Sequence, residues 1–270
     1  MRFKVGFVKY LNSWPLYNGL DSSVVDSFFG TPAEIWQALE AGSVDYAQLP
    51  SYEYLRNRKK FELFDGFCIT TKKKTVKSVL FFSNKPITEL HKEEIFYTDH
   101  SRTSVNLLKV LLAQNGSKDN KWSKQSLSCQ DLLNQRFANA LIIGDEALLA
   151  WKLAKEGKLS NYYCYDLADE WFKLTSLNFV FAVFVANKKP SEDKQFANKQ
   201  KQKLQEVLQK NLENNLASLA LKKVDFKSKL SNELILEYLD GIDYSLNCER
   251  MNSLDKFANY LGFVTSTLGL

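Results

Sequence analysis

The sequence predicts an α/β protein of two lobes, with mixed sheets, helices on both faces of each sheet and a ligand cleft between the lobes. Strand-like and helix-like segments alternate through the first third of the chain, and the alternation begins again near residue 94. Two apolar connections, "SVLFFSNKP" and "FVFAVFVAN", are suited to passing between the lobes. With 270 residues, 45% of them apolar, the chain can bury a substantial core.

The first third begins with a strand over residues 3–8 and an apolar run over 24–29. The clearest helix follows at 31–42, where Thr31 can act as N-cap, Pro32 occupies the first helical position and Glu34 completes a capping box. Gly42 can close this helix in the left-handed conformation. The strand "VDYAQL" and the helix "SYEYLRNRKK" come next.

A second unit of alternating elements follows. Its sequence predicts a strand at "EIFYT", a helix at "VNLLKVLLAQNG", a strand over residues 140–143 and a helix that ends at Gly157. After "YYCYDL" and the long apolar run, the chain is mostly helical from residue 191 onward. We therefore expect one discontinuous lobe of residues 1–84 plus 188–270 and a second lobe of residues 85–187. The hinge is expected near 82–86 and 182–188, and such a hinge leaves a cleft that can enclose a small ligand.

The net charge of +5 resides in one segment, because residues 188–229 hold eleven lysines, no arginine and five acidic residues. Lysines at helical spacing without arginine or interleaved aromatics favour a solvated helix face over a nucleic-acid site. The longest promising uncharged segment spans only residues 174–187, whereas a membrane helix needs about 20 residues. No signal peptide is apparent, so we expect a cytoplasmic protein without nucleic-acid or membrane partners. The sequence leaves the oligomeric state open.

Several common site signatures are absent from the sequence. Gly262 and Gly269 are the closest pair of glycines, so neither a dinucleotide-binding G-x-G-x-x-G, a P-loop nor a G-x-S-x-G elbow can form. His91 and His100 are the only histidines, and the four cysteines are widely separated. We therefore expect no metal centre and no cofactor.

Polar turns at the ends of predicted strands remain as candidates for a site. Asn12 and Ser13 follow the first strand, where open α/β folds place their ligands, although a local Asx turn explains Asn12 equally simply. Ser51 follows the third strand, and Ser83 ends "SVLFFS", where it could also be a plain hinge residue. Asp145 follows "LIIG" and could instead complement a helix dipole as a first-turn acid.

Among these turns, the segment "HSRTS" gives the most specific signal for a binding site. Ser101, Arg102, Thr103 and Ser104 would place hydroxyls, free backbone N–H groups and a guanidinium at a helix N-terminus, which suits a carboxylate or phosphate. The alternative is that Ser101 only caps the helix, while Arg102 pairs with Asp99 or Glu146 on the surface.

The polar turns lie within six longer segments, "YLNSWPL" (10–16), "GTPAEIWQALEAGSVDYAQLPSYEYL" (30–55), "SVLFFS" (78–83), "SRTSVNLLKVLL" (101–112), "IIGDEAL" (142–148) and "DLADEWFKLTSLNFVFAVF" (166–184). Taken together, these segments resemble those of the chorismate dehydratases that open the futalosine route to menaquinone. The resemblance implies a type II periplasmic-binding-protein-like fold used by a cytoplasmic enzyme. A related family later in that route, which cleaves a cyclic futalosine derivative, opens with a different signature.

The chain departs from the family pattern at three positions. Ser176 and Asn178 stand where the family usually has glycine and proline, and His100 stands where a small residue is common. These changes touch the predicted hinge and the anion-binding turn, so affinity or closure could differ.

The reaction implied by the resemblance removes water from chorismate, a dianion, to give 3-[(1-carboxyvinyl)oxy]benzoate. We expect Asn12 to bind the departing hydroxyl or the neighbouring carboxylate, and Arg102 to face it across a dry gap. One carboxylate would lie at the 101–104 turn, and the other at hydroxyls such as Ser51 and Ser83. The resemblance also implies that the substrate's enolpyruvyl carboxylate takes the ring proton. The rival functions are a non-catalytic solute-binding protein of the same fold and the ligand-sensing half of a transcription regulator.

Overall fold

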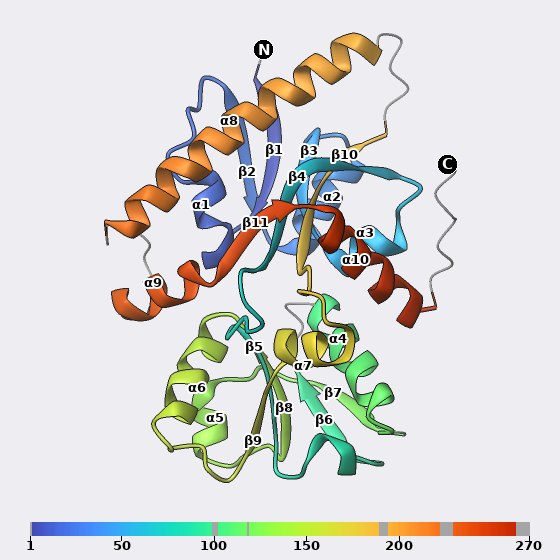
Figure 1. Cartoon of the computed structure of the whole chain (residues 1–270), viewed down its shortest axis with the longest axis vertical. Coiled ribbons are helices and arrows are strands. Elements are labelled where there is room, and N and C mark those ends of the chain that lie inside the picture. Colours follow the sequence, from blue (N-terminus) through green and yellow to red (C-terminus); the bar gives the residue numbers. More distant parts are fainter. Residues whose placement is uncertain (1, 99–101, 118, 189–193, 222–228, 263–270) are drawn as a thin grey trace.

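The computed structural model describes residues 2–98, 102–117, 119–188, 194–221 and 229–262. The chain forms two α/β lobes, each built on one mixed sheet, which lie one above the other in Figure 1. The first and the last described elements of the chain, Phe3–Val8 and Cys248–Tyr260, belong to the larger lobe, so the smaller lobe is inserted in the middle of the sequence. This arrangement confirms the predicted fold class.

The sheet of the larger lobe has six strands in the order β11-β4-β10-β3-β1-β2. β1 is parallel to β2 and β3, whereas β10 runs antiparallel to β3 and β4, and β11 antiparallel to β4. The carboxyl ends of the parallel strands point toward the smaller lobe (Figure 1). The strands are β1 (Phe3–Val8), β2 (Val25–Gly30), β3 (Tyr46–Pro50), β4 (Phe61–Thr71), β10 (Ala182–Asn187) and β11 (Ile242–Leu246).

The helices of the larger lobe begin where the sequence places caps. In α2, Thr31 Oγ1 accepts a hydrogen bond from Glu34 N (3.3 Å) and Glu34 Oε2 accepts one from Thr31 N (2.7 Å), which confirms the predicted capping box. No helix in the described ranges has both the length and the apolar character needed to cross a bilayer. The helices are η1 (Leu11–Ser13), α1 (Trp14–Tyr17), α2 (Pro32–Glu40), α3 (Ser51–Arg56), α8 (Lys194–Ala220), α9 (Asn232–Asp240) and α10 (Cys248–Tyr260).

The sheet of the smaller lobe has five strands in the order β7-β6-β8-β5-β9. β6 is parallel to β7 and β8, whereas β5 runs antiparallel to β8 and β9. The elements are β5 (Val79–Ser83), η2 (Ile87–Glu89), β6 (Glu94–Tyr97), α4 (Arg102–Gln114), β7 (Lys121–Lys124), α5 (Cys129–Leu133), β8 (Asn139–Ile143), α6 (Asp145–Lys155), β9 (Tyr163–Asp166) and α7 (Leu167–Thr175).

The chain crosses between the lobes earlier than the sequence predicts, through residues 72–78 and 176–181. The two apolar segments assigned to the hinge are strands inside the sheets: β5 belongs to the smaller lobe and β10 to the larger. Their side chains are buried, which a hinge does not require but a sheet interior does. Ser176 closes α7 with a φ of 59°, a conformation that favours glycine, so the departure from the family's glycine falls on a strained position.

An apolar cluster of aromatic side chains joins the lobes on one side. Trp171 of α7 is fully buried, and its ring contacts Phe179 (5.3 Å between centroids) and Phe257 of α10 (5.9 Å) edge-on. Its indole Nε1 donates a hydrogen bond to Ser253 Oγ (3.0 Å). Because these contacts cross from one lobe to the other, the lobes share part of one hydrophobic core.

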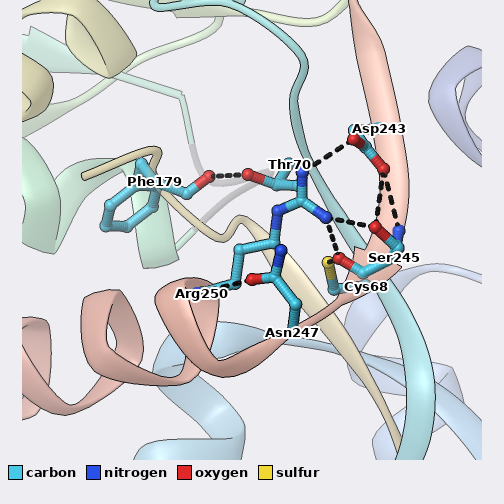
Figure 2. A network of polar contacts seen from close by, with 7 residues as sticks. All are labelled: Cys68, Thr70, Phe179, Asp243, Ser245, Asn247 and Arg250. Atoms are coloured by element: carbon cyan, nitrogen blue, oxygen red, sulfur yellow. Dashed lines mark hydrogen bonds and ion pairs between the residues drawn. The ribbon is translucent and has the colours of Figure 1, made fainter.

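A polar network fixes α10 and β11 to the sheet of the larger lobe (Figure 2). Arg250 Nη2 pairs with Asp243 Oδ2 (2.7 Å), and Nη1 donates to Ser245 O and Oγ. The Asn247 side chain accepts from Arg250 N (3.0 Å) and caps α10. Thr70 Oγ1 donates to Phe179 O (2.8 Å), so the same corner holds the second crossing segment.

Asp166 ties the first crossing segment to the start of α7. One carboxylate oxygen accepts from Lys77 N (2.6 Å) and Val76 N (2.9 Å), and the other caps the helix by accepting from Ala168 N (3.0 Å). Burial raises the pKa of this carboxyl to about 6, although the backbone hydrogen bonds act in the opposite direction. The folded protein therefore holds a proton at Asp166 over a pH range in which an unfolded chain has lost it.

We expect Asp166→Asn to change how stability depends on pH. A carboxyl with a raised pKa contributes stability below its unfolded pKa of 3.8, and this contribution is lost as the pH rises through about 6. The loss in the wild type is on the order of 3 kcal/mol. Urea unfolding between pH 4 and 7 should show this decline in the wild type and not in Asp166→Asn. Hydrogen bonds from Ser128 lower the pKa of Asp131, so Asp131→Asn should keep the wild-type decline. Equal slopes in the wild type and Asp166→Asn would contradict the prediction.

Candidate functional site

A cavity of about 370 Å³ lies between the two lobes, within the range typical of small-molecule sites. Its wall is mostly apolar, and both lobes and the first crossing segment contribute to it. In the described part of the chain, no three His, Cys, Asp or Glu side chains converge as a metal site would require. The wall consists of Val8, Lys9, Tyr10, Leu11, Asn12, Pro32, Gln48, Pro50, Ile69, Val76, Ser78, Val79, Ser104, Ile143, Gly144, Asp145, Glu146, Leu148, Phe181, Ala182 and Tyr238.

The end of β1 supplies the most polar part of the wall. β1 stops at Val8, and the chain turns through Lys9 and Tyr10 into η1, which begins at Leu11 and carries Asn12 into the cavity wall. Parallel strands end in this way at ligand sites of open α/β folds. Asn12 is the predicted catalytic residue, and the structure places it at the cavity.

The hydroxyl of Tyr238 meets Asn12 from α9. Ser78 Oγ donates to Tyr238 Oη (3.0 Å), and the Asn12 side chain also hydrogen-bonds to this phenol. Burial raises the pKa of Tyr238 to about 12, despite the two hydrogen bonds that act in the opposite direction. The phenol therefore keeps its proton at neutral pH and braces Asn12 against the first crossing segment.

Ser13 and Gln48 lie beside Asn12 and are almost completely buried. Ser13 Oγ donates to Gln48 Oε1 (2.9 Å), which also accepts from Val8 N (3.3 Å). Ser13 has no exposed surface and does not line the cavity, whereas Gln48 does. Ser13, a predicted substrate-binding residue, thus holds Gln48 in place from behind the wall.

The smaller lobe places the first turns of two helices at the cavity. Ser104 comes from the start of α4, and Gly144, Asp145 and Glu146 come from the start of α6. Free N–H groups in a first helical turn favour an anion. Glu146 Oε2 accepts from Cys129 N (2.9 Å), so this carboxylate is held at the start of α5. Ser104 and Asp145 are predicted site residues that the structure places in the wall.

Arg102 does not line the cavity. Its guanidinium Nη1 pairs with Glu53 Oε1 of α3 (2.9 Å) and lies over the Tyr52 ring (5.5 Å to the centroid), with the side chain 58% exposed. The next residue, Thr103, is buried and accepts a hydrogen bond from Tyr52 N (3.1 Å). Arg102 thus forms a surface ion pair, as in the alternative, but its partner is Glu53 and not the predicted Glu146, while Asp99 lies outside the described residues. The ion pair connects the lobes.

Ser51 and Ser83 also lie away from the cavity, and Ser101 is outside the described residues. Ser51 Oγ donates to Val180 O (2.6 Å), and Ser83 Oγ donates to Lys85 O (2.6 Å). Ser78 directly precedes β5 and Ser83 is its last residue, and the cavity is at the Ser78 end. Since a strand rises about 3.3 Å per residue, Ser83 is too far along β5 to reach a ligand there.

Comparison with known proteins places the chain in a family. The sequence model of a family described as menaquinone biosynthesis matches residues 3–262. The chain belongs to this menaquinone biosynthesis family. A chorismate dehydratase of Thermus thermophilus is 28% identical over 192 residues, which cover 67% of this chain and 69% of the relative.

Solved structures similar to this member of the menaquinone biosynthesis family confirm the fold. The protein AF1704 of Archaeoglobus fulgidus has a TM-score of 0.63 at 11% identity, covering 97% of this chain and 98% of its own. The CA3427 gene product of Candida albicans, described as having the generic periplasmic binding protein fold, has a TM-score of 0.62 at 11% identity, with 99% and 92% covered. The aliphatic sulphonate-binding protein SsuA of Escherichia coli has a TM-score of 0.55 at 14% identity, with 97% and 86% covered.

Six polar residues of the cavity wall were not among the site residues predicted from the sequence, namely Lys9, Tyr10, Gln48, Ser78, Glu146 and Tyr238. Lys9 directly precedes the "YLN" segment, and Gln48 is an amide inside an apolar strand, so both carried a local signal. Ser78 is the first serine of "SVLFFS" and Ser83 is the last. The sequence does not tell which of the two lies at the cavity, because this depends on how the strand is placed in its sheet. Tyr238 lies in the weakly patterned C-terminal part, where no local feature distinguishes it from a core tyrosine.

Proposed function

We propose that the chain dehydrates chorismate to 3-[(1-carboxyvinyl)oxy]benzoate, the first dedicated step of the futalosine route to menaquinone, in the cytoplasm. Family membership and the chorismate dehydratase relative support this assignment. The observation that carries it is the cavity that is lined both by Asn12, from the "YLN" segment of the larger lobe, and by Ser104 and Asp145 of the smaller lobe.

The cavity suits a small dianion with an apolar ring. Ile69, Val79, Ile143, Leu148 and Phe181 give it a largely apolar lining, and a polar contact is stronger where a ligand displaces water from such a lining. The first turn of α4 carries no acidic residue and favours negative charge from the smaller lobe, whereas Asp145 and Glu146 place carboxylates in the first turn of α6. In the described part of the wall, Lys9 is the one cationic side chain, and it comes from the larger lobe. We assign one carboxylate to each lobe on this basis.

The reaction breaks a ring C–H and a ring C–O bond, and the ring becomes aromatic as water leaves. In the proposal, the enolpyruvyl carboxylate of the substrate takes the ring proton, as the resemblance to the dehydratases implies. Asn12 hydrogen-bonds to the departing hydroxyl, and Tyr238 holds the Asn12 side chain in place. Positioning of this kind can supply about 7–11 kcal/mol of barrier lowering in favourable cases.

Incubation of the purified protein with chorismate tests the proposed function. We expect a new aromatic absorbance and a product that is lighter than chorismate by one water molecule in mass spectrometry. The fold also supports a second candidate function, a non-catalytic small-anion-binding protein, because SsuA and similar proteins share it. Binding of chorismate with no change in its mass would favour that second function.

Matched substitutions at Lys9 and Arg102 test the placement of the carboxylates. Lys9→Met should raise the KM for chorismate about tenfold or more, since a hydrogen bond to a charged group contributes about 1.5–3 kcal/mol. Arg102→Met removes the same charge outside the cavity and breaks an exposed ion pair, which costs about 1 kcal/mol or less in stability. Steady-state kinetics should therefore show a larger rise in KM for Lys9→Met. A larger rise in KM for Arg102→Met would indicate that a carboxylate of the substrate binds at the 101–104 turn, as predicted from the sequence.

A further inference from the structure

Gln48 and Ser104 are the most deeply buried polar residues in the cavity wall, and Gln48 is the one that carries an amide. It lies in the central strand β3, is 2% exposed and lines the cavity directly. Amide side chains are uncommon inside sheets because an unpaired buried amide costs free energy. The position therefore calls for partners for both ends of the amide.

The carbonyl end of Gln48 has its partners within the protein. Oε1 accepts from Ser13 Oγ at 2.9 Å and from Val8 N at 3.3 Å, which uses both of its lone pairs. The amide nitrogen Nε2 carries two N–H donors, and neither makes a hydrogen bond to another residue that the structure describes. Because Oε1 is turned toward Val8 and Ser13, Nε2 is the end presented to the cavity.

The neighbours of Gln48 indicate which ligand group it receives. β3 pairs with β1 in parallel, so Gln48 lies beside the end of β1 from which Lys9 enters the wall. Two amide donors beside a lysine suit a group that only accepts hydrogen bonds and carries negative charge. A carboxylate meets both conditions, whereas a hydroxyl meets neither, because it also donates a hydrogen bond and carries no charge.

We infer that the Nε2 group of Gln48 binds a carboxylate of the substrate and that Gln48, with Lys9, forms the carboxylate subsite of the larger lobe. This inference rests on the proposed function for the identity of the substrate. Ser13 acts through Gln48 as a positioning residue, because its hydroxyl holds Oε1 and thereby fixes the direction of the donors.

Gln48→Glu separates the donor role from the structural one. The substitution keeps an oxygen that can accept from Ser13 and Val8, and replaces the donor nitrogen by an oxygen that repels a carboxylate. At pH 8 we expect the KM for chorismate to rise about 30-fold or more, with no loss of cooperative unfolding. Gln130→Glu, on the exposed face of α5, introduces the same charge and should leave KM unchanged.

Lowering the pH provides a readout that a purely structural role would not produce. Glutamate in a buried site has a raised pKa, and its protonated form regains one donor. The KM of Gln48→Glu should therefore approach the wild-type value between pH 8 and pH 5. An unchanged KM at pH 8, or a raised KM that does not respond to pH, would overturn the inference.

Binding of isophthalate, a simple aromatic dicarboxylate, distinguishes this inference from the proposed function. Calorimetry should show that the wild type binds isophthalate and that Gln48→Glu binds it at least tenfold more weakly at pH 8. If the wild type binds isophthalate in this way but leaves chorismate unchanged, the proposed function fails and the carboxylate subsite stands. If chorismate is converted and Gln48→Glu binds isophthalate like the wild type, the subsite fails and the function stands. Absence of both conversion and binding in the wild type would overturn both.

Discussion

Asn12→Ala should fold like the wild type and lose about 100-fold or more of its turnover of chorismate. Asn12 lies in the cavity wall at the end of β1, and its side chain is held by the hydroxyl of Tyr238. Alanine removes the hydrogen-bond donor that we assign to the departing hydroxyl. The fold should be kept, because the main chain of η1 needs no side-chain cap at this position. The loss should appear mainly in kcat, because the contact strengthens as the C–O bond breaks.

Asn134→Ala is the control variant for this result. Asn134 is an exposed residue at the end of α5, outside the cavity wall, so the Asn134→Ala variant should retain wild-type turnover. Circular dichroism and the Tm should match for all three proteins. Turnover of Asn12→Ala within threefold of the wild type would remove Asn12 from the mechanism.

Trp171→Ala should lower the free energy of unfolding by about 3–5 kcal/mol, the largest loss of stability that we expect from one substitution. The indole is fully buried against Phe179 and Phe257, so alanine leaves a cavity where the two lobes meet. The change also leaves Ser253 Oγ without the hydrogen bond from Nε1. Urea unfolding should show a lower midpoint.

Two further variants separate the contributions at Trp171. Trp171→Phe keeps most of the apolar volume and removes the indole N–H, so it should cost less than Trp171→Ala. Tyr163→Ala removes an aromatic ring that is 49% exposed, and its effect should stay within about 0.5 kcal/mol. A loss at Trp171→Ala no larger than the loss at Tyr163→Ala would show that the aromatic cluster does not stabilise the contact between the lobes.

Local signals predicted the individual elements of the fold well. Thr31, Pro32 and Glu34 form the predicted start of α2, and Gly42 follows its end with a φ of +70°. The sequence could not assign the apolar strands at residues 79–83 and 182–187 to a sheet, because an apolar strand reads the same in either lobe. The long-range pairing of β10 with β3 and β4 decides where the lobes begin and end, and no local pattern encodes it.

The site was only partly predictable for the same reason. Asn12, Ser104 and Asp145 follow or begin elements whose ends point into the cavity, and strand ends and helix starts can be read from sequence. The hydroxyl of Ser13 looked equally suitable, but its direction depends on Gln48, 35 residues away. Tyr238 reaches Asn12 from the opposite end of the chain, so only the folded structure reveals that contact.

The adjacency of β4 and β10 in the six-stranded sheet has a consequence for protein engineering. Ile69 is directly opposite Ala182, so the chain departs from and returns to neighbouring points of that sheet. A short artificial loop from Thr71 to Ala182 could close the larger lobe into a minimal protein. That truncated form would uncover Phe257 of α10 and should self-associate in water until polar substitutions replace the lost aromatic cover.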